Sequence, residues 1–99
     1  MEMKTLHLTL KEEWFKMILR GIKKEEYREI KPYWDVRLEG RNYDVIKFTW
    51  GYGGDKPYMI VKCNGIYKDG VGNPDWGWDG PCYIIKLGKI IESGNIDDK

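Results

Sequence analysis

The sequence predicts a single α+β domain, a small mixed β-barrel of about five to six short strands with two short helices early in the chain. Three observations support this prediction. Apolar residues alternate along several short segments, glycine-rich turns separate those segments, and helical spacing is confined to the N-terminal half. A chain of 99 residues is large enough to bury one core, so residues 1–99 are expected to form one domain.

The first expected elements are a strand and a helix. Leucine occupies every second position over residues 6–10, which predicts a strand with one apolar face. Thr9 and Glu12 have the spacing of a capping box, so we expect a helix that starts there and runs to about Arg20. Gly21 suits the position after the helix end because a left-handed conformation needs no Cβ.

The rest of the chain predicts more strands than helix. Residues 24–29 form a strand with few apolar side chains, which favours the edge of a sheet or a position facing a cleft. Pro32 suits the first turn of a second helix, which Gly40 ends. Gly65 is expected to mark a bulge and Gly88 a kink. The remaining segments are three strands (43–50, 58–67 and 81–91), two glycine-rich loops (51–57 and 69–81) and a frayed tail (92–99).

The composition excludes several classes of protein. With 41% hydrophobic and 14% aromatic residues, the chain is too apolar to be disordered. Seventeen basic and sixteen acidic residues give a net charge of +1, so non-specific binding to duplex DNA or RNA is not indicated. No segment approaches the roughly 20 apolar residues that span a bilayer, and no signal peptide is visible. A soluble, cytoplasmic protein without a membrane partner is therefore expected, and the oligomeric state is left open.

The sequence does not indicate a metal site or a cofactor site. Cys63 and Cys82 lie inside apolar runs, which predicts buried, reduced thiols. His7 is the one histidine, and it cannot complete a zinc set with two cysteines unless another ligand joins. Residues 69–75 hold several oxygen ligands, but they lack the final glutamate of an EF-hand and contain a proline, so a turn is predicted. No metal or cofactor is expected.

The most informative segment is residues 21–28, with the spacing G-x-K-x-x-E-x-R. On a strand, Glu26 and Arg28 point to the same face, with Lys23 at the mouth of the site. Arg28 offers a rigid fork for phosphate or a base edge, Glu26 accepts from base N–H groups, and Lys23 neutralises phosphate or serves as an acid or base. A structural role is the alternative: an exposed ion pair of Glu26 with Arg28, or one with neighbours such as Glu25 and Glu29, would contribute about 0–1 kcal/mol.

Aromatic side chains supply a second signal. Trp76 and Trp78 lie in a glycine-rich loop, and Tyr33 follows the charged segment. Flat rings beside cationic side chains suit the stacking of unpaired bases, worth about 1–3 kcal/mol per base. The alternative for the two loop tryptophans is that they plug an end of the barrel. Trp14 and Trp50 are assigned mainly to the core.

Together these features resemble the start of an ASCH domain, a small β-barrel of the PUA-like group. The resemblance lies in a first strand, a helix with Trp14-Phe15, and then Gly21, Lys23, Glu26 and Arg28, and it covers about a quarter of the 99 residues. It implies a PUA-like pseudo-barrel that binds RNA or nucleotides in a cleft beside the charged segment.

Some ASCH proteins are amidohydrolases that remove an acyl group from a modified cytidine. In those enzymes a lysine stands at the position of Lys23 and a threonine nucleophile at the position of Glu26. The present chain has glutamate instead, and residues 58–67 contain no match for a later glutamate that those enzymes use. This departure favours a binding site over that activity, because a carboxylate cannot replace a hydroxyl nucleophile without a change of chemistry.

The sequence therefore predicts a domain that recognises single-stranded RNA or a nucleotide-like small molecule in a cleft. The expected ligand-binding residues are Lys23, Glu26, Arg28, Tyr33, Trp76 and Trp78. One alternative is a small hydrolase acting on a modified nucleoside or on RNA, with Lys23 and Glu26 as its catalytic acid–base pair. A second is a protein-interaction module in which exposed tryptophans meet a partner chain.

Overall fold

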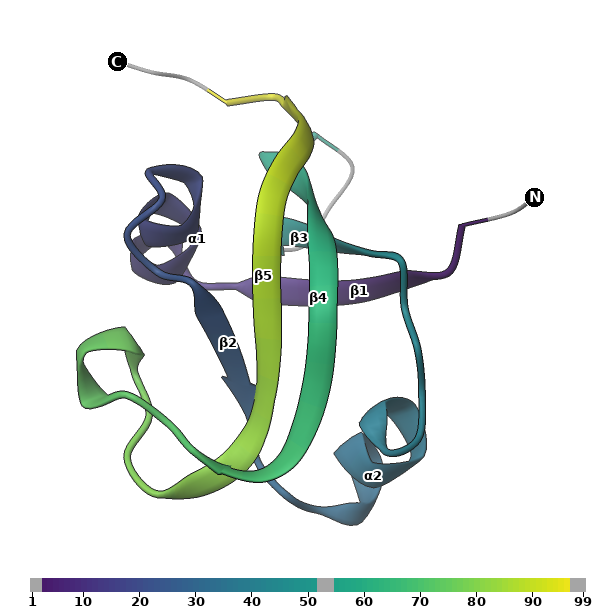
Figure 1. Ribbon diagram of the computed structural model, residues 1–99. Coiled ribbons are helices and arrows are strands. Elements are labelled where there is room, and N and C mark those ends of the chain that lie inside the picture. Colours follow the sequence, from purple (N-terminus) through teal and green to yellow (C-terminus); the bar gives the residue numbers. More distant parts are fainter. Residues whose placement is uncertain (1–2, 52–54, 97–99) are drawn as a thin grey trace.

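The computed structural model describes residues 3–51 and 55–96, which form a small α+β domain with a five-stranded mixed sheet and two α-helices (Figure 1). The predicted class and the early position of both helices are confirmed. Along the chain the elements are β1 (Thr5–Leu10), α1 (Glu12–Leu19), β2 (Glu25–Arg28), α2 (Pro32–Leu38), β3 (Val45–Trp50), β4 (Tyr58–Val71), the 3-10 helix η1 (Pro74–Trp76) and β5 (Pro81–Gly94).

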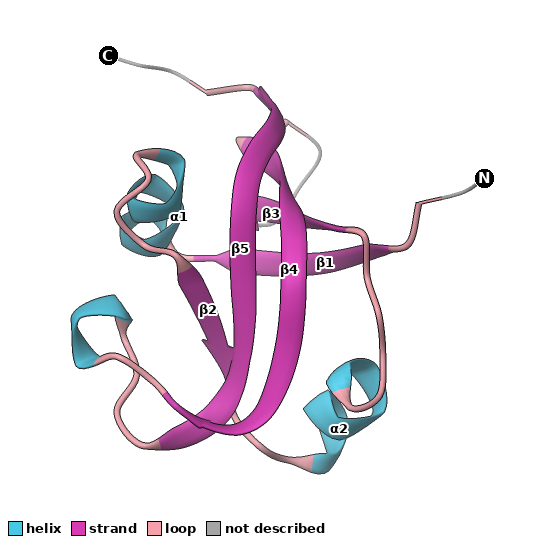
Figure 2. Ribbon diagram, in the orientation of Figure 1, coloured by secondary structure: helices cyan, strands magenta, loops and turns pink. Residues whose placement is uncertain are grey.

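The sheet has the strand order β1-β3-β4-β5-β2. β1 runs parallel to β3, and every other pair is antiparallel. The sheet is strongly curved, since β1 crosses behind the long strands β4 and β5 (Figure 2). β2 is an edge strand, as its low apolar content predicted, and β1 is the other edge. The curvature brings these two edges together, because Nη2 of Arg28 on β2 lies 3.4 Å from the carbonyl oxygen of Thr9 on β1.

The β4–β5 ladder has four register shifts, and two of them lie at the positions that the sequence predicted. Asn64 and Gly65 of β4 both lie between the pairs that join Cys63 to Leu87 and Ile66 to Ile85. Gly65 has φ +126°, so the predicted bulge is confirmed. The expected kink at Gly88 is a second bulge, where β5 has two residues opposite one residue of β4.

β4 and β5 begin where the sequence predicted, but each runs further at its C-terminal end. β4 continues to Val71, into the segment that was expected to be a loop. Gly70 fits there because a Cβ would lie only 2.3 Å from Cδ1 of Ile84, so a larger residue would have to displace the Ile84 side chain on the facing strand. At the other end, residues 92–94 were expected to fray but pair with residues 58–60. Residues 97–99 of the expected tail and residues 52–54 of the expected loop lie outside the described residues.

α1 ends as predicted but begins differently. The expected capping box is wrong: Thr9 belongs to β1, with its Oγ1 3.5 Å from Oγ1 of Thr49, and Lys11 is the N-cap residue without a side-chain cap. At the other end Gly21 has φ +77° and its N–H donates to the carbonyl of Ile18. With the N–H of Ile22 bonded to Met17, this is a Schellman motif.

The core lies between the curved sheet and the two helices. α1 contributes Phe15 and Ile18, and α2 contributes Leu38. The sheet supplies the other side chains of this core cluster: Leu6, Leu8, Leu10, Ile46, Phe48, Met59, Val61, Tyr83, Ile85 and Leu87. Both cysteines are free thiols as predicted, although only Cys82 is fully buried and Cys63 is partly exposed.

The described residues contain neither a membrane-spanning helix nor a cluster of metal ligands. No helix there is long and apolar enough to cross a membrane. No cluster of three or more His, Cys, Asp or Glu side chains in that part of the chain could hold a metal ion.

Candidate functional site

Glu26 stands between two cations at the centre of the site. Its Oε1 lies 2.9 Å from Nζ of Lys23, and its Oε2 accepts a hydrogen bond of 2.6 Å from Nη1 of Arg28. The prediction that Glu26 and Arg28 share one face of a strand is confirmed. We call Lys23, Glu26 and Arg28 the charged trio; with Lys23 protonated it carries one positive charge in excess.

Lys23 is enclosed by the protein. Its side chain is 0% exposed, and Nζ donates to the carbonyl oxygen of Glu25 at 2.5 Å. The rings of Tyr27 and Trp14 cover it, with centroids 4.7 and 5.9 Å from Nζ. Burial lowers the pKa of Lys23, although the carboxylate of Glu26 acts in the opposite direction. The structure therefore places Lys23 behind the wall of the site, and not at its mouth as the sequence suggested.

The guanidinium group of Arg28 is held mainly through Nη1. Both hydrogens of Nη1 are used, by Glu26 and by the carbonyl oxygen of Tyr27 at 2.8 Å. Nη2 makes the long contact to Thr9, and among the described residues no acceptor is bonded to Nε. The ring of Trp34 lies over the guanidinium group, 5.3 Å from Cζ to centroid. With 17% of its side chain exposed, Arg28 is the member of the trio most open to solvent.

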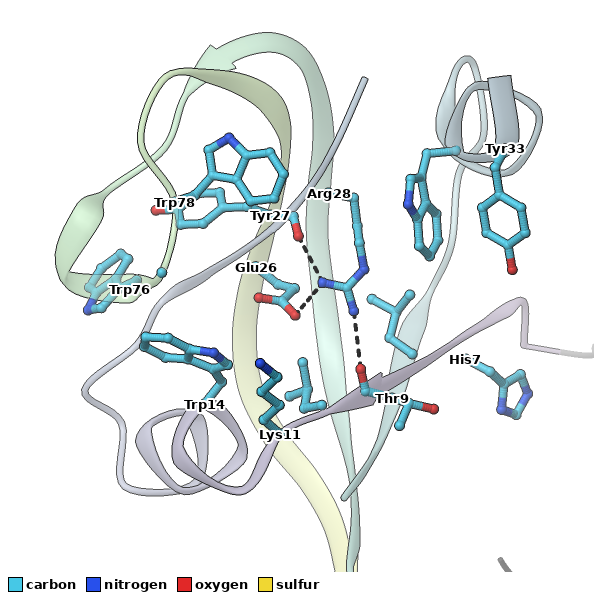
Figure 3. A pocket seen from close by; sticks show the side chains of 14 residues that line it. His7, Thr9, Lys11, Trp14, Glu26, Tyr27, Arg28, Tyr33, Trp76 and Trp78 are labelled. Carbon is cyan, nitrogen blue, oxygen red and sulfur yellow. Dashed lines mark hydrogen bonds and ion pairs between the residues drawn. The ribbon is translucent and has the colours of Figure 1, made fainter. Parts of the chain in front are cut away.

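A cavity of about 530 Å³ opens in front of Glu26 and Arg28, between the two edge strands of the sheet (Figure 3). Its volume falls within the range of small-molecule sites. Strand β1 lines it with residues 7–10 and β2 with residues 26–28. Aromatic side chains from three other elements complete the wall: Trp14 of α1, Tyr33 and Trp34 of α2, and Trp76 and Trp78 of residues 72–80, which contain η1 and which we call the η1 loop. In Figure 3 the labelled tryptophans and Tyr33 lie on opposite sides of Glu26 and Arg28.

The η1 loop is positioned by a contact with α1. Gly77 ends η1 with φ +96°, and a Cβ there would lie 2.8 Å from Cζ2 of Trp14. The ring of Trp14 therefore packs directly on the loop backbone. Within the loop, Oδ1 of Asn73 accepts from the N–H of Asp75, and the carbonyl oxygen of Asn73 accepts from the N–H groups of Trp76 and Trp78. These bonds give residues 72–80 a defined turn, and both of its tryptophans line the cavity.

The opposite wall is α2, which hydrogen bonds attach to the sheet. The ring of Tyr33 meets that of Trp34 edge to face, with 4.8 Å between centroids. The hydroxyl of Tyr83 on β5 donates to the carboxylate of Asp35. Burial, followed by this hydrogen bond, raises the pKa of Tyr83 to about 12. Lys68 of β4 adds an ion pair with Asp35, at 3.5 Å.

Of the six residues expected to bind a ligand, five line the cavity: Glu26, Arg28, Tyr33, Trp76 and Trp78. Lys23 does not. Sequence reasoning missed Trp14, which was assigned to the core but is half-buried in the cavity wall, and it missed Thr9 and Lys11. The sequence did offer a signal for Trp14. It lies in the first turn of the helix that follows β1, and so close to the edge strand that lines the cavity. Trp50 does pack beside Phe15 at the core, 6.1 Å between centroids.

Comparison with protein-family models, with curated proteins and with solved structures found no match for this chain.

Proposed function

We propose that this protein binds single-stranded RNA or a nucleotide in the cavity between β1 and β2. One observation carries the proposal: a single cavity joins a guanidinium group with open donors to five aromatic side chains from three separate elements. Aromatic faces stack unpaired bases, and an arginine among them binds a base edge or a phosphate. The resemblance of residues 6–28 to an ASCH domain favours the same function. We propose further that the curved sheet is a PUA-like pseudo-barrel.

The charge of the site agrees with this ligand. The charged trio has one positive charge in excess, and Lys11 adds a cation at the rim of the cavity. Because the whole chain has a net charge of only +1, affinity would come from this site and not from a general basic surface. A site of this kind recognises a few nucleotides, with a modest dependence of affinity on salt concentration.

The hydrolase alternative has one observation in its favour. Burial lowers the pKa of Lys23, and a lysine that loses its proton more easily is a better base. However, Nζ of Lys23 is bonded to Glu25 and Glu26, and Lys23 does not line the cavity. A bound ligand would meet Glu26 and Arg28 first, so binding is the better supported function. Turnover of a nucleoside or RNA that Lys23→Met abolishes in a folded protein would favour the hydrolase.

The third possibility, a protein-interaction surface built on exposed tryptophans, has less support. Trp76 and Trp78 are each half-buried, and both line the cavity. The indole Nε1 of Trp78 also donates to the carbonyl oxygen of Pro81 at 3.3 Å. A flat protein partner would have less access to these rings than a base that enters the cavity edge-on.

The test is a titration of the protein with short single-stranded RNAs and with nucleotides, followed by tryptophan fluorescence. Four tryptophans line the cavity, so binding should change the emission. Arg28→Ala is expected to weaken binding by about tenfold to a hundredfold, the loss of a hydrogen bond to a charged group. Trp78→Ala should remove about 1–3 kcal/mol of stacking.

Arg41→Ala is the matched control. Arg41 is exposed and lies away from this cavity, so the variant loses the same charge while the site keeps its contacts. It should bind as the unmodified protein does. Equal losses in the Arg28 and Arg41 variants would show that only net charge matters, and no change of fluorescence with any RNA or nucleotide would contradict the proposed function.

A further inference from the structure

The guanidinium group of Arg28 has one edge committed to the protein and one edge open to the cavity. Nη1 gives both its hydrogens to Glu26 and Tyr27. Among the described residues Nε has no hydrogen-bond partner, yet no buried side-chain nitrogen or oxygen there lacks one. Nε is therefore reached by solvent. Figure 3 shows the Nε side of the group turned away from Glu26, toward the wall that holds Tyr33.

An open Nε–Nη2 edge presents two parallel N–H donors. Nη2 carries two hydrogens, and among the described residues its one contact is the long one to the carbonyl oxygen of Thr9 at 3.4 Å. A pair of parallel donors is satisfied by two acceptors that are neighbours in one plane. Glu26 is less available than Arg28 to bind a ligand, since each of its carboxylate oxygens already faces a cation of the charged trio. It therefore does not counter the preference of Arg28 for two acceptors.

Resting on the proposed function, we infer that this edge of Arg28 selects bases with two adjacent acceptors. Guanine offers O6 beside N7, and cytosine offers O2 beside N3. Adenine sets its N6 amino donor beside N7 or N1, and uracil separates its two carbonyl oxygens by an N–H. Adenine or uracil would therefore leave one donor of Arg28 unpaired or opposed to another donor, which is costly in an enclosed site.

The position of Arg28 favours a base over a phosphate as the bound group. Its side chain is only 17% exposed, and aromatic rings line the cavity on both sides of it. A flat base fits between such rings, whereas a strongly hydrated phosphate is better placed at the rim, where Lys11 is exposed.

The test compares affinities for the 5′-monophosphates of guanosine, cytidine, adenosine and uridine, measured by calorimetry. All four carry the same phosphate, so differences report the base. The guanosine and cytidine nucleotides should bind about tenfold or more tightly than the other two. The 7-deazaguanosine nucleotide, which lacks N7, should lose most of the advantage of guanosine. This last comparison uses the unmodified protein and does not depend on whether a variant folds.

Arg28→Lys is the protein-side test, with its fold checked by circular dichroism. Lysine keeps the charge but has no fork, so the discrimination between guanine and adenine should disappear. Equal affinity for all four nucleotides, with competition by inorganic phosphate, would show that Arg28 holds the phosphate; the inference would then fail while the proposed function stood. Tighter binding of adenine or uracil would also overturn it. No binding of any nucleotide or RNA would instead refute the proposed function itself.

Discussion

Replacing Glu26 by glutamine is expected to destabilise the fold by about 3–5 kcal/mol, the usual cost of removing one partner from a buried ion pair. The side chain of Glu26 is 6% exposed and that of Lys23 0%. Glutamine keeps the shape but removes the negative charge between Nζ of Lys23 and Nη1 of Arg28, which lie 2.9 and 2.6 Å from its oxygens. The ammonium group would then be buried beside a second cation, with no carboxylate between them.

Urea unfolding followed by tryptophan fluorescence measures this loss, and Glu12→Gln is the matched control. Glu12 is paired with Lys16 at 2.6 Å, as close as Glu26 is to Arg28, but its side chain is 51% exposed. An exposed pair one helical turn apart contributes only about 0.3–0.5 kcal/mol. If both variants lost stability by less than about 0.5 kcal/mol, the reasoning from burial would be refuted.

A double-mutant cycle separates the pair from its surroundings. Lys23→Met replaces the enclosed ammonium with an apolar group of similar length, and Glu26 keeps Arg28 as its partner. Combining it with Glu26→Gln should cost less than the sum of the two single changes, by about 0.5–3 kcal/mol, because the glutamine no longer faces a buried charge. Strict additivity would mean that Lys23 and Glu26 do not interact in solution.

Two further predictions concern the walls of the cavity. Gly77→Ala should destabilise the fold more than Gly80→Ala and should shift the fluorescence of Trp14. Both glycines have positive φ, but only at Gly77 would a Cβ collide with the indole ring of Trp14. Equal losses of stability in the two variants would contradict this prediction. Tyr83→Phe should lessen the alkaline loss of stability, because the unfolded tyrosine loses its proton near pH 10 while the folded one, beside Asp35, holds it to about pH 12. Tyr83 thus contributes stability that is complete below pH 10 and is lost between pH 10 and 12. Urea midpoints measured across that range should therefore fall less in the variant than in the unmodified protein. The same fall in both proteins would contradict this prediction.

The sequence predicted those elements whose cause is local. Gly21 after a helix and Pro32 at the start of another act through backbone conformation, and both helices end or begin there. The predicted capping box failed because Thr9 is paired with Thr49 in the parallel β1–β3 ladder. That pairing joins segments distant in the chain, and its strand hydrogen bonds outweigh one side-chain cap. Local spacing could not show this competition.

The C-terminal ends of β4 and β5 show the same limit. Glycine usually interrupts a strand, so Gly70 suggested a loop. In the structure Gly70 lies opposite Cys82, next to a register shift in the β4–β5 ladder, and its missing side chain leaves room for Ile84 of the facing strand. The same residue type therefore indicates a turn or a close approach of two strands, and only the partner strand decides between them.

For the site, the sequence placed Glu26 and Arg28 together because alternation along a strand fixes which side chains share a face. It could not place Trp14 against Gly77, because that contact joins α1 to a loop near the other end of the chain. Nor could it show that Lys23 is enclosed. The rings of Trp14 and Tyr27 that cover Nζ come from two different elements, and their meeting depends on the curvature of the sheet.

The structural and the functional explanations of the charged trio are compatible, because Arg28 divides its donors between them. Nη1 is fixed by Glu26 and by the carbonyl oxygen of Tyr27, while Nε faces the cavity. Ordering an arginine costs about 2 kcal/mol of side-chain entropy, and here the fold has already ordered it before a ligand arrives. The ion pair therefore orients the fork in advance of the proposed ligand. It follows that Glu26→Gln should weaken discrimination between guanine and adenine even under conditions where the variant stays folded, since a mobile guanidinium no longer presents one fixed edge.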